Sequence, residues 1–148
     1  MADIPLKNPA ELAGRLALQD SRRLLLVDAP PSLEELLSRE PPSGSSIASI
    51  PADAIRSVKQ SFDAILAWRE DRVGSHAFFE ALLKRLDLSA TLWIVTAMKK
   101  VTGPQTPAAR RLELSDLVKA FSGAGFRHER EVRVSAWHVA YRFVRRKA

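Results

Sequence analysis

The amino-acid sequence predicts a single α/β domain over residues 1–148, with helices on both faces of a mostly parallel sheet, a three-layer arrangement. Short continuous apolar runs recur along the chain, and such runs are typical of strands that are buried on both faces. Segments with helical periodicity separate the runs, and this alternation favours parallel strands joined by right-handed crossovers. The last two strand-like segments are too close together for a helical crossover, so we expect them to form an antiparallel hairpin.

Each expected helix is placed by the residues at its start and by its apolar stripe. Ser32 and Glu35 have the spacing of a capping box, and Ser115 has the residue type of an N-cap. The expected elements are a helix over 8–18 within an N-terminal helical extension (1–20), strands over 24–27, 47–50, 62–68 and 91–98, and helices over 33–40, 75–87 and 115–121.

Residues 126–146 are expected to form the C-terminal hairpin. The first of its strands alternates charged with apolar residues, which suits a sheet edge because charge discourages pairing with another chain. Val139, Tyr141 and Phe143 give the last strand an apolar face, so we expect this strand inside the sheet.

Composition excludes several classes of site and location. The chain has no cysteine, which excludes disulfides, thiolate nucleophiles and cysteine-ligated metals. The histidines, His76, His128 and His138, share no metal-ligand spacing, so we expect no metal site. The N-terminal residues lack a signal-peptide pattern, and no apolar run approaches the roughly 20 residues of a membrane helix. We therefore expect a cytoplasmic protein without a membrane partner.

Positive charge is concentrated in the second half of the chain. Residues 1–74 contain 9 Lys/Arg and 11 Asp/Glu, a net charge of −2, whereas residues 75–148 contain 14 and 6, a net charge of +8. The basic ending, Arg142, Arg145, Arg146 and Lys147, is a candidate nucleic-acid contact. No helix-turn-helix, aromatic RNA-binding signature or zinc finger accompanies it, and a solvated basic face is the alternative interpretation.

Several segments resemble the class I AdoMet-dependent methyltransferases. "LLLVDAP" (24–30) matches the first strand of these enzymes, and "FDAILAWRE" (62–70) and "LSATLWIVTAMKK" (88–100) match two later strands. The segment "LWIVTAMKK", taken together with "LVKAFSGAGF" and "SAWHVAYRFVRR", more closely resembles a short bacterial family catalogued as a domain of unknown function. The resemblance covers roughly residues 20–146. It implies a Rossmann-like, methyltransferase-like fold with a C-terminal hairpin, and it implies no particular reaction.

The sequence departs from the methyltransferase pattern where the cofactor binds. Glycines at the first strand–helix turn would let the backbone approach AdoMet, but this chain has the residues Ala29-Pro30-Pro31-Ser32. The acid that holds the cofactor ribose has no clear equivalent in "SSIASIP", and residues 50–62 are too few for the usual strand and helix. We therefore expect no cofactor, with AdoMet binding as the alternative.

Ligands of open α/β sheets bind at the carboxyl ends of the strands, which defines a candidate crevice. The residues expected there are Asp28, Trp68, Arg69, Glu70, Lys99 and Lys100. Mixed charges beside an aromatic wall suit a phosphorylated or carboxylated small molecule, and the alternative is a set of ordinary loop charges, with Asp28 bonded to loop amides. The favoured function is a non-catalytic binding or interaction module that contacts a protein or an anionic small molecule. The alternatives are a small-molecule transferase with an altered cofactor pocket and a nucleic-acid-binding accessory protein.

Overall fold

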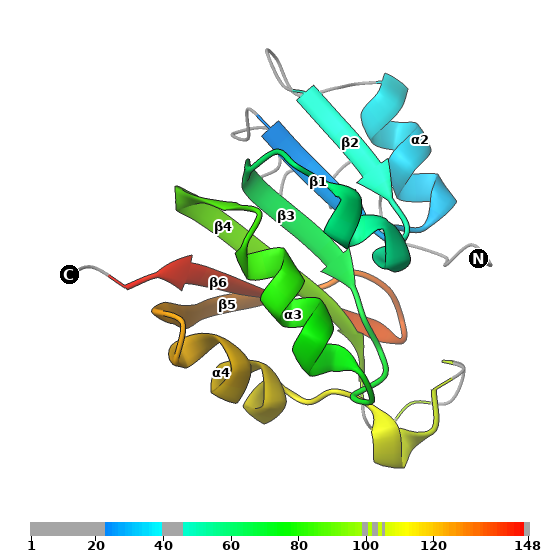
Figure 1. Cartoon of the computed structure of the whole chain (residues 1–148). Coiled ribbons are helices and arrows are strands. Elements are labelled where there is room, and N and C mark those ends of the chain that lie inside the picture. The colour runs from blue at the N-terminus through cyan, green and yellow to red at the C-terminus, as the bar shows by residue number, and fades with distance from the viewer. Residues whose placement is uncertain (1–22, 40–45, 99–100, 102–103, 105, 147–148) are drawn as a thin grey trace.

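The computed structural model describes residues 23–39, 46–98, 101, 104 and 106–146. They contain a six-stranded sheet with the order β2-β1-β3-β4-β6-β5 (Figure 1). Strands β1 to β4 are parallel, and β6 runs antiparallel to both β4 and β5. The strands are β1 (Arg23–Val27), β2 (Ser46–Ile50), β3 (Phe62–Trp68), β4 (Leu86–Ala97), β5 (Phe126–Arg133) and β6 (His138–Arg145). This confirms the mostly parallel α/β fold with a C-terminal hairpin.

Helices lie on both faces of the sheet and complete three layers. The helices α3 (Ser75–Leu83) and α4 (Leu114–Ser122) cover one face, and α2 (Pro31–Arg39) covers the other (Figure 1). Alternate residues of each central strand point to opposite faces, so the buried side chains divide into two clusters. None of the described helices is long and apolar enough to cross a membrane.

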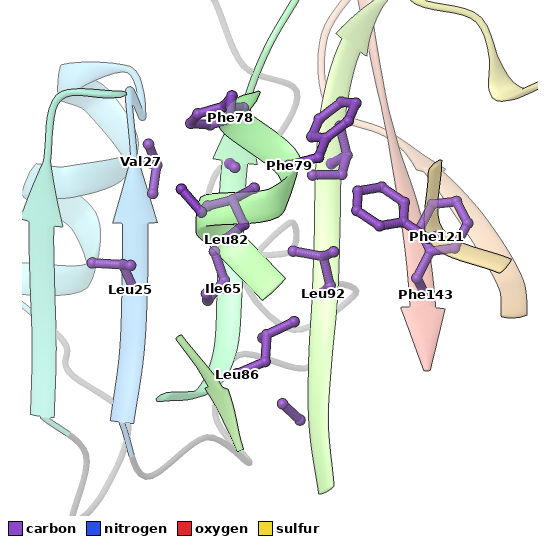
Figure 2. Close-up of a cluster of buried hydrophobic side chains, with 14 of the residues drawn as sticks. Leu25, Val27, Ile65, Phe78, Phe79, Leu82, Leu86, Leu92, Phe121 and Phe143 are labelled. Carbon is purple, nitrogen blue, oxygen red and sulfur yellow. The ribbon is translucent and has the colours of Figure 1, made fainter. Parts of the chain in front are cut away.

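The cluster beneath α3 and α4 is organised by a row of aromatic rings. Phe78, Phe79, Phe121 and Phe143 follow one another with centroid distances of 5.9, 4.9 and 5.0 Å, and thus join α3, α4 and β6. Figure 2 shows these rings beside the aliphatic side chains of the central strands, such as Ile65. The cluster on the opposite face contains Leu33 and Leu37 of α2 together with Trp68 and Trp93.

The hairpin has the predicted arrangement. Strand β6 lies between β4 and β5, and β5 is an edge strand of the described sheet. Val139 and Phe143 are buried and Tyr141 is half-buried, as the apolar face of this strand predicted. The predicted helix over 8–18 and the N-terminal extension lie outside the described residues.

Two predicted helix caps are wrong by two positions. Helix α2 begins at Pro31, and the Pro30 carbonyl accepts the Leu33 N–H at 3.0 Å, so Ser32 lies inside the first turn and is not its cap. Proline suits this first position because its missing N–H would have no partner within the helix. Helix α4 is capped by Glu113 instead of Ser115, in a capping box with Asp116.

The boundary between α3 and β4 also differs from the prediction. The sequence predicts a helix over 75–87, but α3 ends at Leu83 and β4 begins at Leu86. Leu86 pairs with Phe62 at the start of β3, and the Arg85 carbonyl accepts the Phe62 N–H at 2.7 Å. Pairing with a neighbouring strand therefore prevails over the helical period in this segment.

The connection from β2 to β3 contains no further strand. It consists of a short 3₁₀ helix, η2 (Ala52–Ser57), whose Ile55 is buried against the sheet. The prediction that residues 50–62 are too few for a strand and a helix is confirmed. As a result, β2 is the end strand of the sheet in the described part of the chain.

Candidate functional site

The turn after β1 is built around Asp28. Its φ is 54°, in the left-handed region that Asp and Asn tolerate better than most other residues. Its N–H donates to the Ile50 carbonyl at 3.0 Å, and its carboxylate accepts the Ala52 N–H at 3.0 Å. Asp28 thus bonds to a loop amide, the alternative role that the sequence left open, and it ties the end of β1 to the end of β2.

The same turn offers few backbone donors. Pro30 and Pro31 have no N–H, and the Pro30 carbonyl accepts the N–H groups of Leu33 and Glu34 at 3.0 and 3.2 Å. The Asp28 N–H is already bonded to Ile50, as described above. Two of the amides at this helix start are therefore missing, and those of Asp28, Leu33 and Glu34 are used internally.

Trp68 and Arg69, at the end of β3, point toward the protein rather than into an open crevice. Trp68 is only 5% exposed and packs in the cluster beneath α2. Its indole N–H is buried and has no hydrogen-bond partner in the part of the chain that the structure describes. The Arg69 guanidinium donates to the carbonyls of Asp71 (2.9 Å) and Val73, and it lies 5.6 Å from the centre of the Phe78 ring. It stabilises its own loop.

Glu70 forms a buried side-chain network with two residues of the β5–β6 hairpin. Its Oε2 lies 2.6 Å from His138 Nε2, and His138 Nδ1 lies 3.0 Å from Ser135 Oγ. The His138 side chain is 2% exposed and that of Glu70 is 23% exposed. A second Glu70 oxygen accepts the Thr106 N–H at 3.4 Å. The network joins the end of β3 to the start of β6.

The hydrogen bonds around Ser135 fix the direction of this network. Its Oγ accepts the N–H groups of Trp137 and His138, both at 3.0 Å, which uses both lone pairs of the hydroxyl. The Ser135 O–H therefore donates to Nδ1 of His138, and Nε2–H of His138 donates to Glu70. A hydroxyl that donates to a histidine held by a carboxylate has the order of an activated nucleophile. Here both lone pairs of Ser135 are occupied by backbone N–H groups and the residue is only 1% exposed, so it serves as a structural link.

The charge on Glu70 is stabilised by its partners. The hydrogen bond from His138 is the largest influence and lowers the pKa of Glu70 below its ordinary value, against the opposing effect of burial. Glu70 is therefore a carboxylate at neutral pH.

Arg111 holds the loop that follows β4. This buried side chain donates to the carbonyls of Met98 (2.8 Å), Val101 (2.7 Å) and Thr106 (2.8 Å). Lys99 and Lys100, predicted for the crevice, belong to this loop but lie outside the described residues. Within the described chain, no group of His, Asp and Glu is placed to hold a metal ion.

The predicted nucleic-acid residues do not share one face. Arg142 and Arg145 lie three positions apart on β6, so they point to opposite faces of the sheet. Arg142 pairs with Glu129 at 2.9 Å, and Arg145 donates to the Asp87 carbonyl at 3.3 Å and lies over the Phe126 ring. Arg146 is exposed, and Lys147 is outside the described residues.

Sequence reasoning assigned no site role to Ser135, His138 or Arg111. The spacing of Ser135 and His138, three residues apart at a predicted turn, was the available signal for the first two. Arg111 follows Arg110 in a loop, and nothing in the local sequence distinguishes a buried arginine from an exposed one.

Several solved methyltransferases have the same fold as this chain. A SAM-dependent methyltransferase from Aquifex aeolicus is similar over 93% of this chain and 89% of its own, with a TM-score of 0.70 and 16% identity. This chain has a methyltransferase fold. The N-methyltransferase NodS from Bradyrhizobium japonicum WM9 is similar over 95% and 99% of the two chains (TM-score 0.59, 16% identity), and a putative type 11 methyltransferase from Sulfolobus solfataricus over 99% and 85% (0.57, 15%). At these identities the likeness establishes the fold alone. No model of a protein family matches the sequence, and neither does any curated protein.

Proposed function

We propose that this protein is a binding or interaction module on a methyltransferase fold, and that it does not take AdoMet at the turn after β1. The observation that carries the proposal is the lack of backbone donors there. Pro30 and Pro31 have no N–H, and neighbouring N–H groups are bonded within the protein. Loss of two or three hydrogen bonds, at about 1 kcal/mol each, lowers affinity by about 10²-fold.

The surroundings of the turn support the same conclusion. The end of β2, where an acid would hold the cofactor ribose, is Ile50 followed by Pro51. Asp28 is close by, but its carboxylate accepts a backbone N–H from the β2–η2 connection. The residues present therefore do not fit AdoMet, and no transfer step is assigned to them.

Calorimetric titration with AdoMet tests the proposal directly. We expect no binding in the micromolar range for the natural chain. A Pro30→Gly/Pro31→Gly variant restores two N–H groups and is the converse experiment. Pro107→Gly, in an exposed loop, is the control for proline removal elsewhere. A micromolar or tighter constant in the natural chain that disappears in Asp28→Asn would overturn the proposal.

The network of Glu70, His138 and Ser135 favours a second candidate, a small-molecule transferase with an altered cofactor pocket. It lies at the carboxyl ends of the strands, where open α/β sheets bind ligands, and Glu70 retains some exposure. Under this alternative Glu70 would accept a proton from the substrate. AdoMet binding that the Asp28→Asn change leaves unaffected, together with a methyl transfer that Glu70→Gln abolishes, would favour the transferase over the module.

A further inference from the structure

The two edge strands of the described sheet differ in charge. Strand β5 carries exposed charges along its length, among them Arg127, Glu129 and Arg133, and charged edges resist pairing with another chain. Strand β2, at the opposite end of the sheet, has the sequence Ser-Ile-Ala-Ser-Ile and no charge (Figure 1). The further strand that would cover β2 is missing from the β2–β3 connection. Among residues 23–39, 46–98 and 106–146, nothing pairs with or shields the outer side of β2.

The hydrogen bond from the β1 turn to Ile50 shows which residues of β2 direct their N–H and C=O groups toward β1. The Ile50 carbonyl accepts the Asp28 N–H and therefore points toward β1. Both polar groups of a strand residue point to the same side, and the side alternates along the strand. Ala48 consequently also faces β1, whereas Ile47 and Ser49 present their N–H and C=O groups outward. In the described chain β2 pairs with β1 alone.

We propose that a second copy of this chain pairs with β2 in antiparallel orientation, about a two-fold axis that passes beside Ala48. Such an axis is perpendicular to the sheet and keeps each side chain on its own face. The register that pairs the most residues then places Ile47 opposite Ser49 of the second copy, and Ala48 opposite Ala48 of that copy. Ile47 and Ser49 are the outward-facing residues, so each of these pairs exchanges two N–H···O bonds, giving four in all.

The strand is suited to its own copy for two reasons. It has no charge to repel an identical strand, and its smallest apolar side chain lies at the axis, where each side chain meets its equivalent. Association also ends at two copies, because the other edge of the described sheet, β5, is charged and the two β2 edges pair with each other. Five residues make a small interface, so the dimer is weak and its population rises with protein concentration.

The absence of cysteine permits a direct test of the register. Opposed residues that are not hydrogen-bonded to each other have Cα atoms about 4.5 Å apart, within the range of about 4.4–6.8 Å that a disulfide spans. Ala48→Cys should therefore form a disulfide-linked dimer rapidly under mild oxidation. Ser46→Cys is the matched control, because in this register Ser46 faces Ile50 of the second copy. Ser115 is exposed on α4, so Ser115→Cys measures the rate of cross-linking that random collisions produce.

Sedimentation equilibrium across protein concentrations tests the interface without cross-linking. Ser49→Pro removes an outward N–H, so it spares the β1–β2 ladder but costs the dimer two of its four bonds. Ser49→Ala is its control, because it also loses the hydroxyl bond to Glu34 but keeps the N–H. We expect dimers in the natural chain and in Ser49→Ala, and at least a tenfold weaker association in Ser49→Pro. A natural chain that stays monomeric, a dimer that Ser49→Pro leaves unchanged, or Ala48→Cys that cross-links no faster than Ser115→Cys would overturn the proposal.

Discussion

The turn after β1 and the network at the end of β3 both lie at the carboxyl ends of the parallel strands. They satisfy their polar groups in different ways. The turn satisfies backbone groups through neighbours in the β1–α2 and β2–η2 connections, with Asp28 as its one ionisable side chain. The network joins the side chains of Glu70 and His138, which are 68 residues apart. The first arrangement bonds mainly main-chain groups of two adjacent connections, and the second is a contact between side chains that are far apart in the sequence.

The difference indicates at which of the two sites a substitution should destabilise the fold more. A turn held mainly by main-chain hydrogen bonds can lose a side chain and keep most of these bonds. A buried network loses more, because each partner left behind is unsatisfied and has little access to water. We therefore expect the free energy of unfolding to depend more strongly on the network than on the turn.

The largest effect is expected for His138→Ala. It leaves Glu70 and the Ser135 hydroxyl without their partner and creates a cavity, so we expect a loss of about 3 kcal/mol in the free energy of unfolding. Urea denaturation followed by circular dichroism measures it. A loss below about 1 kcal/mol would mean that the network contributes little.

Substitutions of Asp28 should have smaller, graded effects. Asp28→Ala removes the acceptor for the Ala52 N–H and leaves a non-glycine residue at a left-handed φ, so we expect a loss of about 1–2 kcal/mol. Asp28→Gly loses the acceptor but suits the backbone, and Asp28→Asn keeps both features. The expected order of destabilisation is Ala, then Gly, then Asn. Equal values for Ala and Gly would show that the backbone conformation is not strained.

The lowered pKa of Glu70 predicts a change in stability with pH. A carboxyl with a lower pKa in the folded state adds stability above its ordinary pKa of 4.5, and that stability is lost as the pH falls through the folded pKa. The difference in urea midpoint between the natural chain and Glu70→Gln should be constant between about pH 6 and 7 and shrink below about pH 4.5. A difference that stays constant down to about pH 3 would contradict this assignment.

The smallest effect is expected for His76→Ala, which serves as the exposed counterpart of His138→Ala. His76 pairs with Glu80 at 3.0 Å one turn along α3, but both side chains are largely exposed. Exposed pairs of this kind contribute about 0.5 kcal/mol or less, so the unfolding midpoint should hardly move. A loss as large as that of His138→Ala would remove the distinction between buried and exposed pairs.

The sequence by itself determined the features that depend on nearby residues. The apolar runs placed β1 and β3, and the short spacing of the last two strands required a hairpin. The 13 residues over 50–62 left no room for another strand and helix, as the 3₁₀ helix η2 confirms. Pro30 and Pro31 have no N–H in any fold, so the loss of donors at the turn was already present in the sequence.

Only the tertiary structure decided which polar side chains meet. Glu70, His138 and Arg111 come from separate segments, and no periodicity in the chain relates the end of β3 to the start of β6. The start of β4 was likewise decided by pairing with β3, since Leu86 suits a helix or a strand equally by its residue type. Trp68 was expected to line a crevice, but the α2 face of the sheet encloses its ring. Hydrogen bonds and burial of this kind depend on distances between remote residues, and these distances exist only once the sheet has formed.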